Sequence, residues 1–346
     1  YNQFSRGFSL DVLNIRAVME DSKGWLWLGS FDKGINVINP KTGEKMLYMP
    51  DEKNPFSLPF GTVFTIFEDS RKDIWIGTYL GFLQKYDPRT RSFLSYPFYP
   101  WKKEASEGRD IRSIIEDKEG NLWLIPHSHG MSMFNPRTGT FKHYRRDYSN
   151  VSNSIADDWA FQLLLDYEGF IWIATPSGLS KFDPKTEKFR NYYHNPDDSA
   201  SLCNNYINVI FEDSNHNLWI GTSFGLDIFN RKNEKFRHFY VNDGLPSLQI
   251  KSILEHTPGE LWISTGYGLS RMRYLQDTVS GNITATFRNY NTSDNLQDNL
   301  FWERSAWKTK EGLLAFGCEK GLILFNPDEI SDNTVIPKVY KIGRAH

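Results

Sequence analysis

One phrase recurs along the whole chain at intervals of roughly fifty residues, a period typical of propeller blades and solenoid turns. In the clearest copies an acidic pair such as Glu20-Asp21 precedes an apolar Trp segment, and a glycine and an Asn-Pro or Asp-Pro follow. The Trp slot is filled by Trp27, Trp75, Trp123, Trp172, Trp219 and Trp262, and by Ala315 in a seventh copy. Because the repeat is scaffold, function has to be sought in what departs from it.

The copy from Tyr206 to Tyr240 shows what one unit forms. Four apolar segments rich in β-branched and aromatic residues, at 207–212, 218–222, 226–230 and 236–240, alternate with turn residues. This pattern predicts four strands joined by hairpins, which we label a to d from the innermost outward. A small sheet with two apolar faces is stable only when copies pack radially, so the sequence predicts an all-β propeller. The repeated Trp is expected to fill the space between blades.

Seven copies predict a seven-bladed β-propeller with four-stranded antiparallel blades. In the seventh copy we expect strands at 304–308, 313–317 and 322–326, and no fourth strand follows them. The chain opens on an isolated strand, Tyr1–Arg6, whose Tyr1 and Phe4 match the aromatics of other d strands. We expect this N-terminal strand to complete the last blade, which would remove a free edge from the ring. The propeller would span residues 1–330, and 331–346 would form an exit tail whose last residues could derive from a vector.

Composition narrows the classes of partner. The 40 Lys and Arg residues nearly balance 42 Asp and Glu residues, and no basic run stands out, so a nucleic-acid partner is not favoured. No apolar stretch approaches the roughly 18 residues of a membrane span, so we expect no membrane contact by this region. The two cysteines, Cys203 and Cys318, are too few for a disulfide framework. Because the chain begins at Tyr1, without a methionine or signal peptide, we interpret it as a piece of a larger protein.

The repeat resembles the two-component regulator propeller repeat over about residues 1–330. The copies that carry the resemblance most fully are Glu212-Asp213 with Leu218-Trp219-Ile220-Gly221-Thr222 and Gly225-Leu226, and Phe182-Asp183-Pro184-Lys185-Thr186 with Phe189. Proteins of that family supply the periplasmic sensor region of hybrid two-component systems in gut Gram-negative bacteria. Two propellers, a β-sandwich, a membrane span, a histidine kinase and a receiver follow one another in them.

The resemblance implies a position and partners for this chain. The segment 325–330 with Ile336-Pro337 is similar to the exit from the second propeller toward the sandwich, so the chain would be that second propeller. It would lie in the periplasm as part of an inner-membrane protein, next to the other propeller and the sandwich of the same chain, within a homodimeric receptor. It would detect an oligosaccharide, with acidic ones among the candidates, and regulate polysaccharide-utilisation genes. The sequence lacks a kinase His box and a receiver Asp pocket, so we expect no enzyme activity in this piece.

Long and varied loops are expected on one face of the ring. The c–d turns are tight in five of the first six blades, whereas the d–a loops are long, at 51–61, 99–109, 149–158, 195–205 and 291–301. Irregular loops on a rigid scaffold are where binding sites are built, so we call the face with the b–c bends and d–a loops the binding face. Blade six instead has a long c–d hairpin, Arg273 to Phe287, where a sister propeller or the sandwich could dock on the opposite face.

Aromatic residues outside the repeat concentrate on the binding face. Trp101, Trp159 and Trp302 belong to d–a loops or to the start of strand a. The b–c bends add Phe31, Tyr79, His127, His129, Phe224 and Tyr267. Flat rings suit the C–H faces of sugars, and Tyr and Trp also offer a polar group. In the alternative interpretation each ring merely caps the gap between two blades.

Basic residues recur at one position of strand a. Five residues before the aligned positions Asp21, Asp69, Asp117, Asp166, Asp213, His256 and Thr309 stand Arg16, Phe64, Arg112, Phe161, Asn208, Lys251 and Arg304. Strand a begins at the mouth of the channel on the binding face, so four cations would surround one opening and focus their field on an anion. A carboxylate or sulfate of a sugar matches the arginine fork. Alternatively, each cation pairs with a loop carboxylate, such as Asp110, Asp157, Asp158 or Glu303.

No motif predicts a metal, a cofactor or a nucleophile. His127-Ser128-His129 is an isolated pair of histidines without zinc-site spacing. The Glu-Asp pairs recur too regularly to be an acid–base pair, and Asp at the entry to a turn is expected to cap the backbone. Two alternatives to a sensor remain. One is a glycosidase or polysaccharide lyase that uses Asp157, Asp158, Glu303 or Glu319, with two carboxyls about 5 to 9.5 Å apart. The other is a non-binding dimerisation scaffold.

Overall fold

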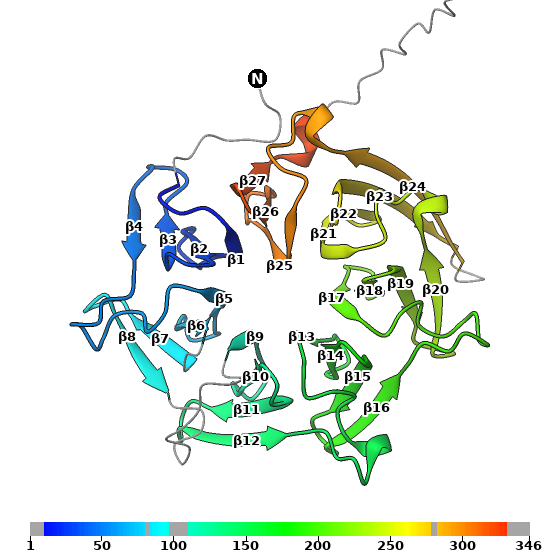
Figure 1. The fold of residues 1–346 in the computed structure, drawn as a ribbon, viewed down its shortest axis with the longest axis horizontal. Helices are drawn as coiled ribbons and strands as arrows, with labels where there is room; N and C mark the ends of the chain where they lie inside the picture. The colour runs from blue at the N-terminus through cyan, green and yellow to red at the C-terminus, as the bar shows by residue number, and fades with distance from the viewer. Residues whose placement is uncertain (1–9, 80–82, 97–109, 278–281, 331–346) are drawn as a thin grey trace, which may run out of the picture.

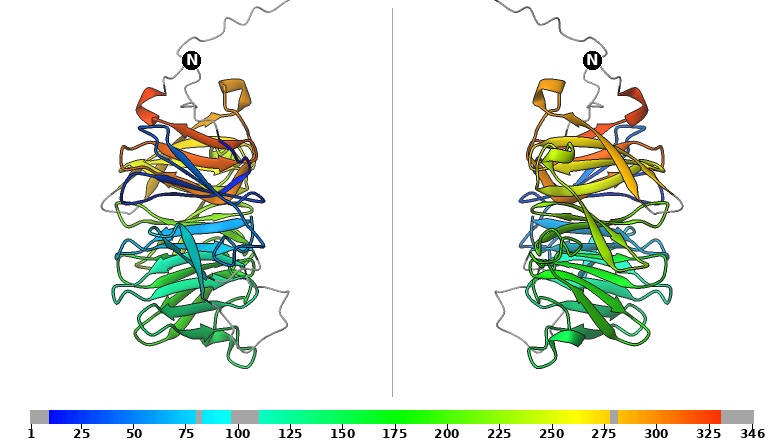
Figure 2. Two further views of the ribbon diagram at one scale, coloured as in Figure 1. Left: turned by 90° about the vertical axis from the view of Figure 1, so that its left-hand side faces the viewer. Right: turned by 90° about the vertical axis from the view of Figure 1, so that its right-hand side faces the viewer.

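The computed structural model describes residues 10–79, 83–96, 110–277 and 282–330, and these form seven antiparallel sheets around a common axis (Figure 1). Six sheets have four strands, and the last has three. Seen from the edge, the sheets make a flat disc (Figure 2). The fold is therefore the predicted seven-bladed β-propeller. Among the described residues, no helix is long and apolar enough to cross a membrane.

The strands follow the sequence order a, b, c, d in every blade. The a strands are β1 Ile15–Glu20, β5 Val63–Glu68, β9 Ile111–Glu116, β13 Gln162–Leu165, β17 Ile207–Glu212, β21 Ile250–Thr257 and β25 Phe301–Lys308. The b strands are β2 Leu26–Ser30, β6 Ile74–Thr78, β10 Leu122–Pro126, β14 Ile171–Thr175, β18 Leu218–Thr222, β22 Glu260–Thr265 and β26 Leu314–Cys318. The a strands line the centre of the ring (Figure 1).

The outer strands complete each blade. The c strands are β3 Ile35–Ile38, β7 Leu83–Asp87, β11 Met131–Asn135, β15 Gly178–Asp183, β19 Gly225–Asn230, β23 Gly268–Gln276 and β27 Gly321–Phe325. The d strands are β4 Lys45–Tyr48, β8 Ser92–Tyr96, β12 Thr140–Tyr144, β16 Lys188–Tyr192, β20 Lys235–Phe239 and β24 Ile283–Tyr290. Four short 3-10 segments lie in the connections, η1 Val151–Asn153, η2 Val241–Asp243, η3 Thr292–Asp294 and η4 Pro327–Glu329.

The repeated Trp packs between blades, as predicted. Trp75 is fully buried, and its ring lies 5.8 Å from that of Phe134 in the next blade. The apolar cluster around it joins Trp75 and Leu83 of blade two to Ile111 and Leu122 of blade three. Burying both faces of each sheet in this way is what makes the seven small sheets stable as a ring.

The repeated Asp holds the Trp of its own blade. The indole N–H of Trp75 donates to Oδ2 of Asp69 at 2.9 Å, and Oδ1 of Asp69 accepts the backbone N–H of Asp73 at 2.9 Å. The pairs Asp21–Trp27, Asp117–Trp123, Asp166–Trp172 and Asp213–Trp219 repeat the first bond at 2.7–3.0 Å. The predicted capping role is confirmed, and the bond to the indole adds a second role. In blade six, where His256 occupies the Asp slot, Glu260 accepts from Trp262 instead.

The repeated Glu joins neighbouring blades. The carboxylate of Glu116 accepts the backbone N–H of Ser70 at 2.7 Å and its hydroxyl at 2.8 Å, across the boundary between blades two and three. Glu20 of blade one accepts the backbone N–H of Lys310 of blade seven at 2.6 Å. The Glu of the pair thus links two neighbouring blades, and the Asp stabilises its own blade.

The first and last blades are in direct contact. The hydroxyl of Ser305 donates to the carbonyl of Ile15 at 3.0 Å, and the N–H of Asn14 donates to the carbonyl of Glu319 at 2.9 Å. An apolar cluster that includes Val12, Leu28 and Leu324 also spans this boundary. The N-terminal strand predicted at 1–6 and the tail predicted at 331–346 lie outside the described residues.

Blade six departs from the others in the predicted way. Its c and d strands, β23 and β24, remain paired out to Gln276 and Ile283, well beyond the ladders of the other blades. Leu275 near the end of this hairpin has 78% of its surface exposed. The hairpin leaves the ring at the c–d end, opposite to the binding face.

Candidate ligand-binding face

Hydrogen bonds between bends and loops show that they share one face. The N–H of Gly34, in the first b–c bend, donates to the carbonyl of Gly61 in the following d–a loop at 2.7 Å. Gly130 and Asp158 repeat this contact at 2.8 Å. Gly34 has φ +79°, and a Cβ there would lie 2.0 Å from the carbonyl oxygen of Tyr48, so only glycine fits this approach. The bends are thereby fixed against the loops that surround the channel mouth.

A β-bulge interrupts strand a near its start in most blades. One residue of strand a has no partner in strand b at Arg16, Phe64, Arg112, Asn208 and Lys251. A bulge removes a residue from the ladder and redirects its side chain. All five belong to the seven positions that stand five residues before the repeated Asp in the aligned copies. The bulge therefore explains why the residue type at this position differs between blades, because the residue is not part of the regular ladder between strands a and b.

The interruption is longer in blade seven. Phe301 pairs with Cys318 and Ala306 pairs with Phe316, so the four residues 302–305 face the single residue Gly317. Arg304 within this segment has φ 61°, a left-handed conformation that is unfavourable for a residue with a side chain. The long bulge moves Trp302, Glu303 and Arg304 together to the mouth. Strand a also begins three residues earlier than the predicted 304–308.

Three of the four predicted cations line one pocket. Arg16, Phe64, Arg112, Trp302, Glu303 and Arg304 surround a space of about 60 Å³, which we call the mouth pocket. Its walls come from blades one, two, three and seven. A second space of about 300 Å³ in the channel is also bordered by Arg304, so the two spaces meet at this residue.

Aromatic rings lie against two guanidinium groups in the mouth pocket. The guanidinium carbon of Arg16 lies 4.3 Å from the ring centroid of Phe31 and 3.8 Å from that of Trp302. The guanidinium carbon of Arg112 lies 4.8 Å from the centroid of Phe64. Cation–π contacts of this kind hold the arginines in place and leave the N–H groups at their edges available for hydrogen bonds.

The alternative that each cation pairs with a carboxylate is correct for two of the four. Nη2 of Arg112 lies 3.3 Å from Oδ2 of Asp110, and Nζ of Lys251 lies 2.5 Å from Oε1 of Glu303. Arg304 donates from Nη1 to the backbone carbonyl of Asn208 at 2.6 Å. Within residues 10–79, 83–96, 110–277 and 282–330, neither Arg16 nor Arg304 forms an ion pair with a carboxylate.

The other two candidate carboxylates hold a loop in place. Asp157 accepts the backbone N–H of Trp159 at 2.9 Å and the hydroxyl of Ser177. Asp158 accepts the backbone N–H of Arg146 at 2.7 Å. Both therefore shape the d–a loop before blade four instead of neutralising the cations.

The pKa values at the mouth reflect burial first and the neighbouring charges second. Burial lowers the pKa of Arg304 to about 10, Glu303 opposes this fall, and the charges of Arg112 and Arg16 add to it. Burial likewise lowers the pKa of Arg16, with Arg112 contributing. Burial alone would raise the pKa of Glu303, but the hydrogen bond from Lys251 and the charges of Arg304 and Lys251 bring it below its ordinary value. Glu303 is thus ionised at neutral pH, and the arginines remain charged.

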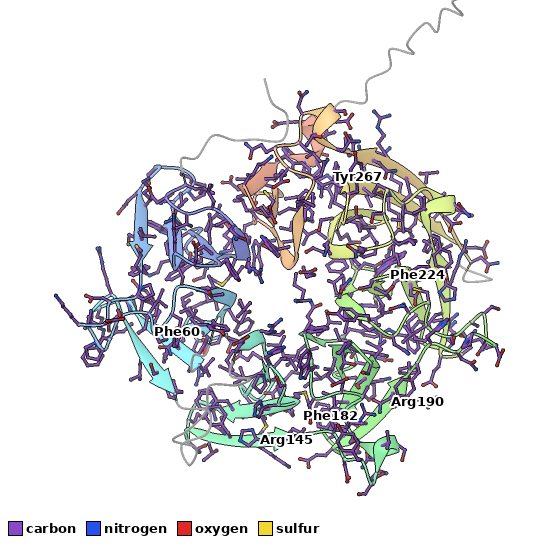
Figure 3. All side chains as sticks on the ribbon, viewed as in Figure 1. Phe60, Arg145, Phe182, Arg190, Phe224 and Tyr267 are labelled. Atoms are coloured by element: carbon purple, nitrogen blue, oxygen red, sulfur yellow. The ribbon has the colours of Figure 1, made fainter. Side chains whose placement is uncertain are left out.

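Exposed aromatic rings surround the mouth pocket on the binding face. Trp159, Phe224 and Tyr267 are 52%, 54% and 55% exposed, and Tyr79 and Phe31 are also exposed. Phe224 and Tyr267 stand on the bends of blades five and six, as Figure 3 shows. The predicted aromatics are therefore spread around the ring instead of gathered at one point. Trp101 lies outside the described residues.

Two aromatics of this rim were missed in the sequence. Phe60 and Tyr206 are exposed in d–a loops, and Phe60 is labelled on blade two in Figure 3. The ring of Phe60 lies 6.2 Å from that of Tyr79, and the ring of Tyr206 lies 5.4 Å from that of Phe161. Their position just before strand a is also that of Trp159, so a search of d–a loops for Phe and Tyr as well as Trp would have found them.

His127 belongs to the rim as a neutral side chain. Its ring lies 5.0 Å from that of Trp159. Burial lowers its pKa, and the charge of Arg112 lowers it further, against the opposing effect of Asp110. An uncharged imidazole tilted against an indole offers apolar ring surface and one hydrogen-bond donor to a ligand.

One group of potential metal ligands lies outside the lining of the mouth pocket and was not predicted. Ligand atoms of Cys203, Asp227 and His238 lie within 4.8 Å of one another in blade five. Nδ1 of His238 is 2.7 Å from Oδ1 of Asp227, and its Nε2 is 2.9 Å from the carbonyl of Ser199. Because both ring nitrogens face oxygen acceptors, this arrangement favours the protonated imidazole and raises the pKa of His238. The group is thus explained as a hydrogen-bonded link. Cys203 and Cys318 are both buried free thiols.

Several known proteins are similar to this chain. The family described as two component regulator propeller matches at residues 9–32, 57–80 and 201–224. Histidine kinase P4 from Formosa agariphila is 31% identical over 191 residues, which are 54% of this chain and 13% of that protein. The extracellular domain assigned to one hybrid two-component system of B. thetaiotaomicron has a TM-score of 0.75 and 28% identity, covering 94% of this chain and 40% of that one.

A further solved structure shares the fold. The extracellular domain assigned to a second hybrid two-component system of the same organism has a TM-score of 0.69 and 20% identity, covering 94% of this chain and 42% of that one. This chain therefore spans less than half of the length of each of these relatives. The similarities agree with the resemblance found in the repeated residues.

Proposed function

Because this chain is built of two-component regulator propeller repeats, the repeats of sensor-like extracellular domains of hybrid two-component systems, we propose that it is a ligand-sensing module. The module would lie in the periplasm as part of an inner-membrane protein, as the second of two propellers. Signalling chemistry would belong to other parts of the receptor, and the absence of enzyme activity in this piece stays a prediction.

The ligand that we propose is an oligosaccharide, and the arrangement of exposed rings carries this proposal. Trp159, Phe224 and Tyr267 each expose more than half of their surface on one face. Exposed aromatics that are spread over several blades suit an extended ligand with repeated C–H faces and hydroxyl groups. The regulated genes would then be those for use of the same polysaccharide.

A rigid ring can transmit the effect of ligand binding to domains that contact its edges. Bonds from the repeated Glu to a backbone N–H, such as Glu116 to Ser70, join adjacent blades at four boundaries of the described structure, so a ligand across several blades would act on the ring as one body. The neighbouring propeller and the β-sandwich of the same chain, in a homodimeric receptor, are the partners that we propose to receive this change. The β23–β24 hairpin on the opposite face is a candidate contact for one of them.

A glycan panel tests the proposal directly. Calorimetric titration of this chain with plant and host oligosaccharides is expected to give heat of binding without new reducing or unsaturated ends. Trp159→Ala should weaken binding, whereas Tyr167→Ala should not, because Tyr167 is similarly exposed, at 49%, in an a–b turn on the opposite face. New ends would support a glycosidase or lyase. Absence of binding together with self-association would support a dimerisation scaffold.

Three of the four carboxylates named for catalysis, Glu303, Asp157 and Asp158, do not favour the enzyme alternative. Glu303 is paired with Lys251 and has a lowered pKa, whereas a general acid needs a raised one. Asp157 and Asp158 accept backbone N–H groups of their own loop region. We therefore propose sensing as the single function of this face.

A further inference from the structure

We propose that the mouth pocket binds one compact anionic group, a carboxylate or a sulfate, through the edges of Arg16, Arg112 and Arg304. This inference rests on the proposed function, in that the anionic group would be part of the sensed oligosaccharide. It adds the chemical class of the ligand and names the residues that bind the anionic group.

Unpaired donors in the pocket are the first support. Nε of Arg16, Nε of Arg112 and Nε1 of Trp302 are all buried, and in the described part of the chain no acceptor reaches any of them. Buried polar groups are nearly always hydrogen-bonded, so three unpaired donors around one small space need an explanation. An anion supplies several acceptor lone pairs at once, and one bound group would satisfy donors from three blades.

Charge balance is the second support. Arg16, Arg112, Lys251 and Arg304 bring four positive charges to the mouth, and their paired carboxylates, Asp110 and Glu303, bring two negative charges. Among these described residues an excess of two positive charges remains, which corresponds to Arg16 and Arg304. Like charges held together at a partly desolvated site repel one another, and a bound anion relieves that repulsion.

The orientation of the arginines is the third support. Phe31 and Trp302 lie over Arg16 at 4.3 and 3.8 Å from its guanidinium carbon, and Phe64 lies over Arg112 at 4.8 Å. These rings occupy two sides of Arg16 and one side of Arg112, which favours approach of ligand atoms to the N–H edges of the two groups. In-plane approach is the geometry of bidentate bonding to carboxylate and sulfate oxygens.

The size of the pocket limits what enters it. A space of 60 Å³ holds roughly the volume of two waters, enough for an anionic group but not for a whole sugar ring. The sugar that carries the group would remain outside and contact the aromatic rim. The left-handed backbone at Arg304 fits this interpretation, since strained conformations persist where a site requires them.

Equilibrium dialysis with radiolabelled sulfate tests the inference on the intact chain at constant ionic strength. We expect one saturable site per chain, displaced by D-glucuronate and not by D-glucose. Arg16→Gln and Arg112→Gln, on separate blades, should each weaken sulfate binding roughly tenfold or more. Arg237→Gln is the matched control, because Arg237 is exposed on strand β20 away from the mouth, and it should bind like the wild type. Circular dichroism of each variant verifies folding.

The outcomes separate this inference from the proposed function. If the wild type binds neither sulfate nor glucuronate saturably, or if Arg237→Gln weakens binding as much as Arg16→Gln, the inference is overturned. Oligosaccharide binding that is unchanged in Arg16→Gln and Arg112→Gln would overturn it and leave sensing intact. Arginine-dependent anion binding without any oligosaccharide ligand would support the pocket and reject oligosaccharide sensing.

Discussion

The guanidinium of Arg16, on the first blade, lies against the indole of Trp302, on the last blade, with 3.8 Å between the guanidinium carbon and the ring centroid. The candidate site therefore lies at the boundary where the ring closes. A ligand that bonds to both residues would bridge the two ends of the propeller. Because blades one and seven are held only by non-covalent contacts among the described residues, such a ligand should also stabilise the closed ring.

Trp302→Phe should separate the stacking role of this indole from its role as a donor. Phe keeps an aromatic face for Arg16 but removes Nε1, a buried donor without an acceptor in the described residues. Removal of an unpaired buried donor costs little, so the free energy of unfolding should fall by no more than about 1 kcal/mol. Sulfate affinity should decrease. Urea unfolding and dialysis measure the two quantities, and unchanged sulfate binding in a folded Trp302→Phe would exclude the indole from the site.

Asp69→Ala should destabilise blade two strongly. It removes the acceptor of the buried Trp75 indole and of the backbone N–H groups of Arg71 and Asp73. Loss of charge-assisted bonds with a donor left unpaired costs about 2–4 kcal/mol. Asp197→Ala, in an exposed loop, is the control and should change the unfolding free energy by less than about 0.5 kcal/mol. Equal effects of the two substitutions in urea unfolding would mean that the Asp–Trp bond does not contribute measurably to the free energy of unfolding.

The repeat made the blade count predictable, because each copy carries its own Trp, Asp and turn residues. The position of Arg16, Arg112 and Arg304 near one opening was also predictable, since strand a lies innermost in every blade. The long bulge at 302–305 was not, because extra residues in a ladder have no distinct composition. The stacking of Arg16 between Phe31 and Trp302 joins distant segments, and only the closed ring determines it.

His238 should make stability depend on pH. Burial alone would lower its pKa, but the hydrogen bond and charge of Asp227 and the bond to the Ser199 carbonyl raise it above the ordinary value. The folded state thus binds the proton more tightly than the unfolded state. The stabilisation from His238 is therefore complete below about pH 6.5 and is lost as the pH rises through the folded pKa.

The difference in melting temperature between wild type and His238→Gln should accordingly shrink as the pH is raised from acid to alkaline. Asp227→Asn provides the control, because it removes the carboxylate that favours the charged imidazole. In that background, substitution of His238 should have an effect that varies little with pH. A wild-type advantage that grows toward alkaline pH would contradict the assigned protonation.

The Arg304→Gly variant should be more stable to unfolding than the Arg304→Ala variant. Its φ of 61° is unfavourable for any residue with a Cβ, by about 1 kcal/mol, whereas glycine adopts it freely. Both variants lose the bond to the Asn208 carbonyl, so the comparison isolates the backbone. Arg304→Gly should therefore unfold at higher urea concentration than Arg304→Ala, and both should have lost sulfate binding.

Lys308 supplies the matched comparison, because it lies in the regularly paired part of the same strand, opposite Leu314. Glycine in a paired strand is less stable than alanine by about 0.5–1 kcal/mol, so Lys308→Gly should unfold before Lys308→Ala. The order of the glycine and alanine variants is thus opposite at two positions of β25. If alanine were the more stable residue at both, the long bulge would not hold Arg304 in the left-handed conformation, and the arginine would not be fixed at the mouth pocket as we infer.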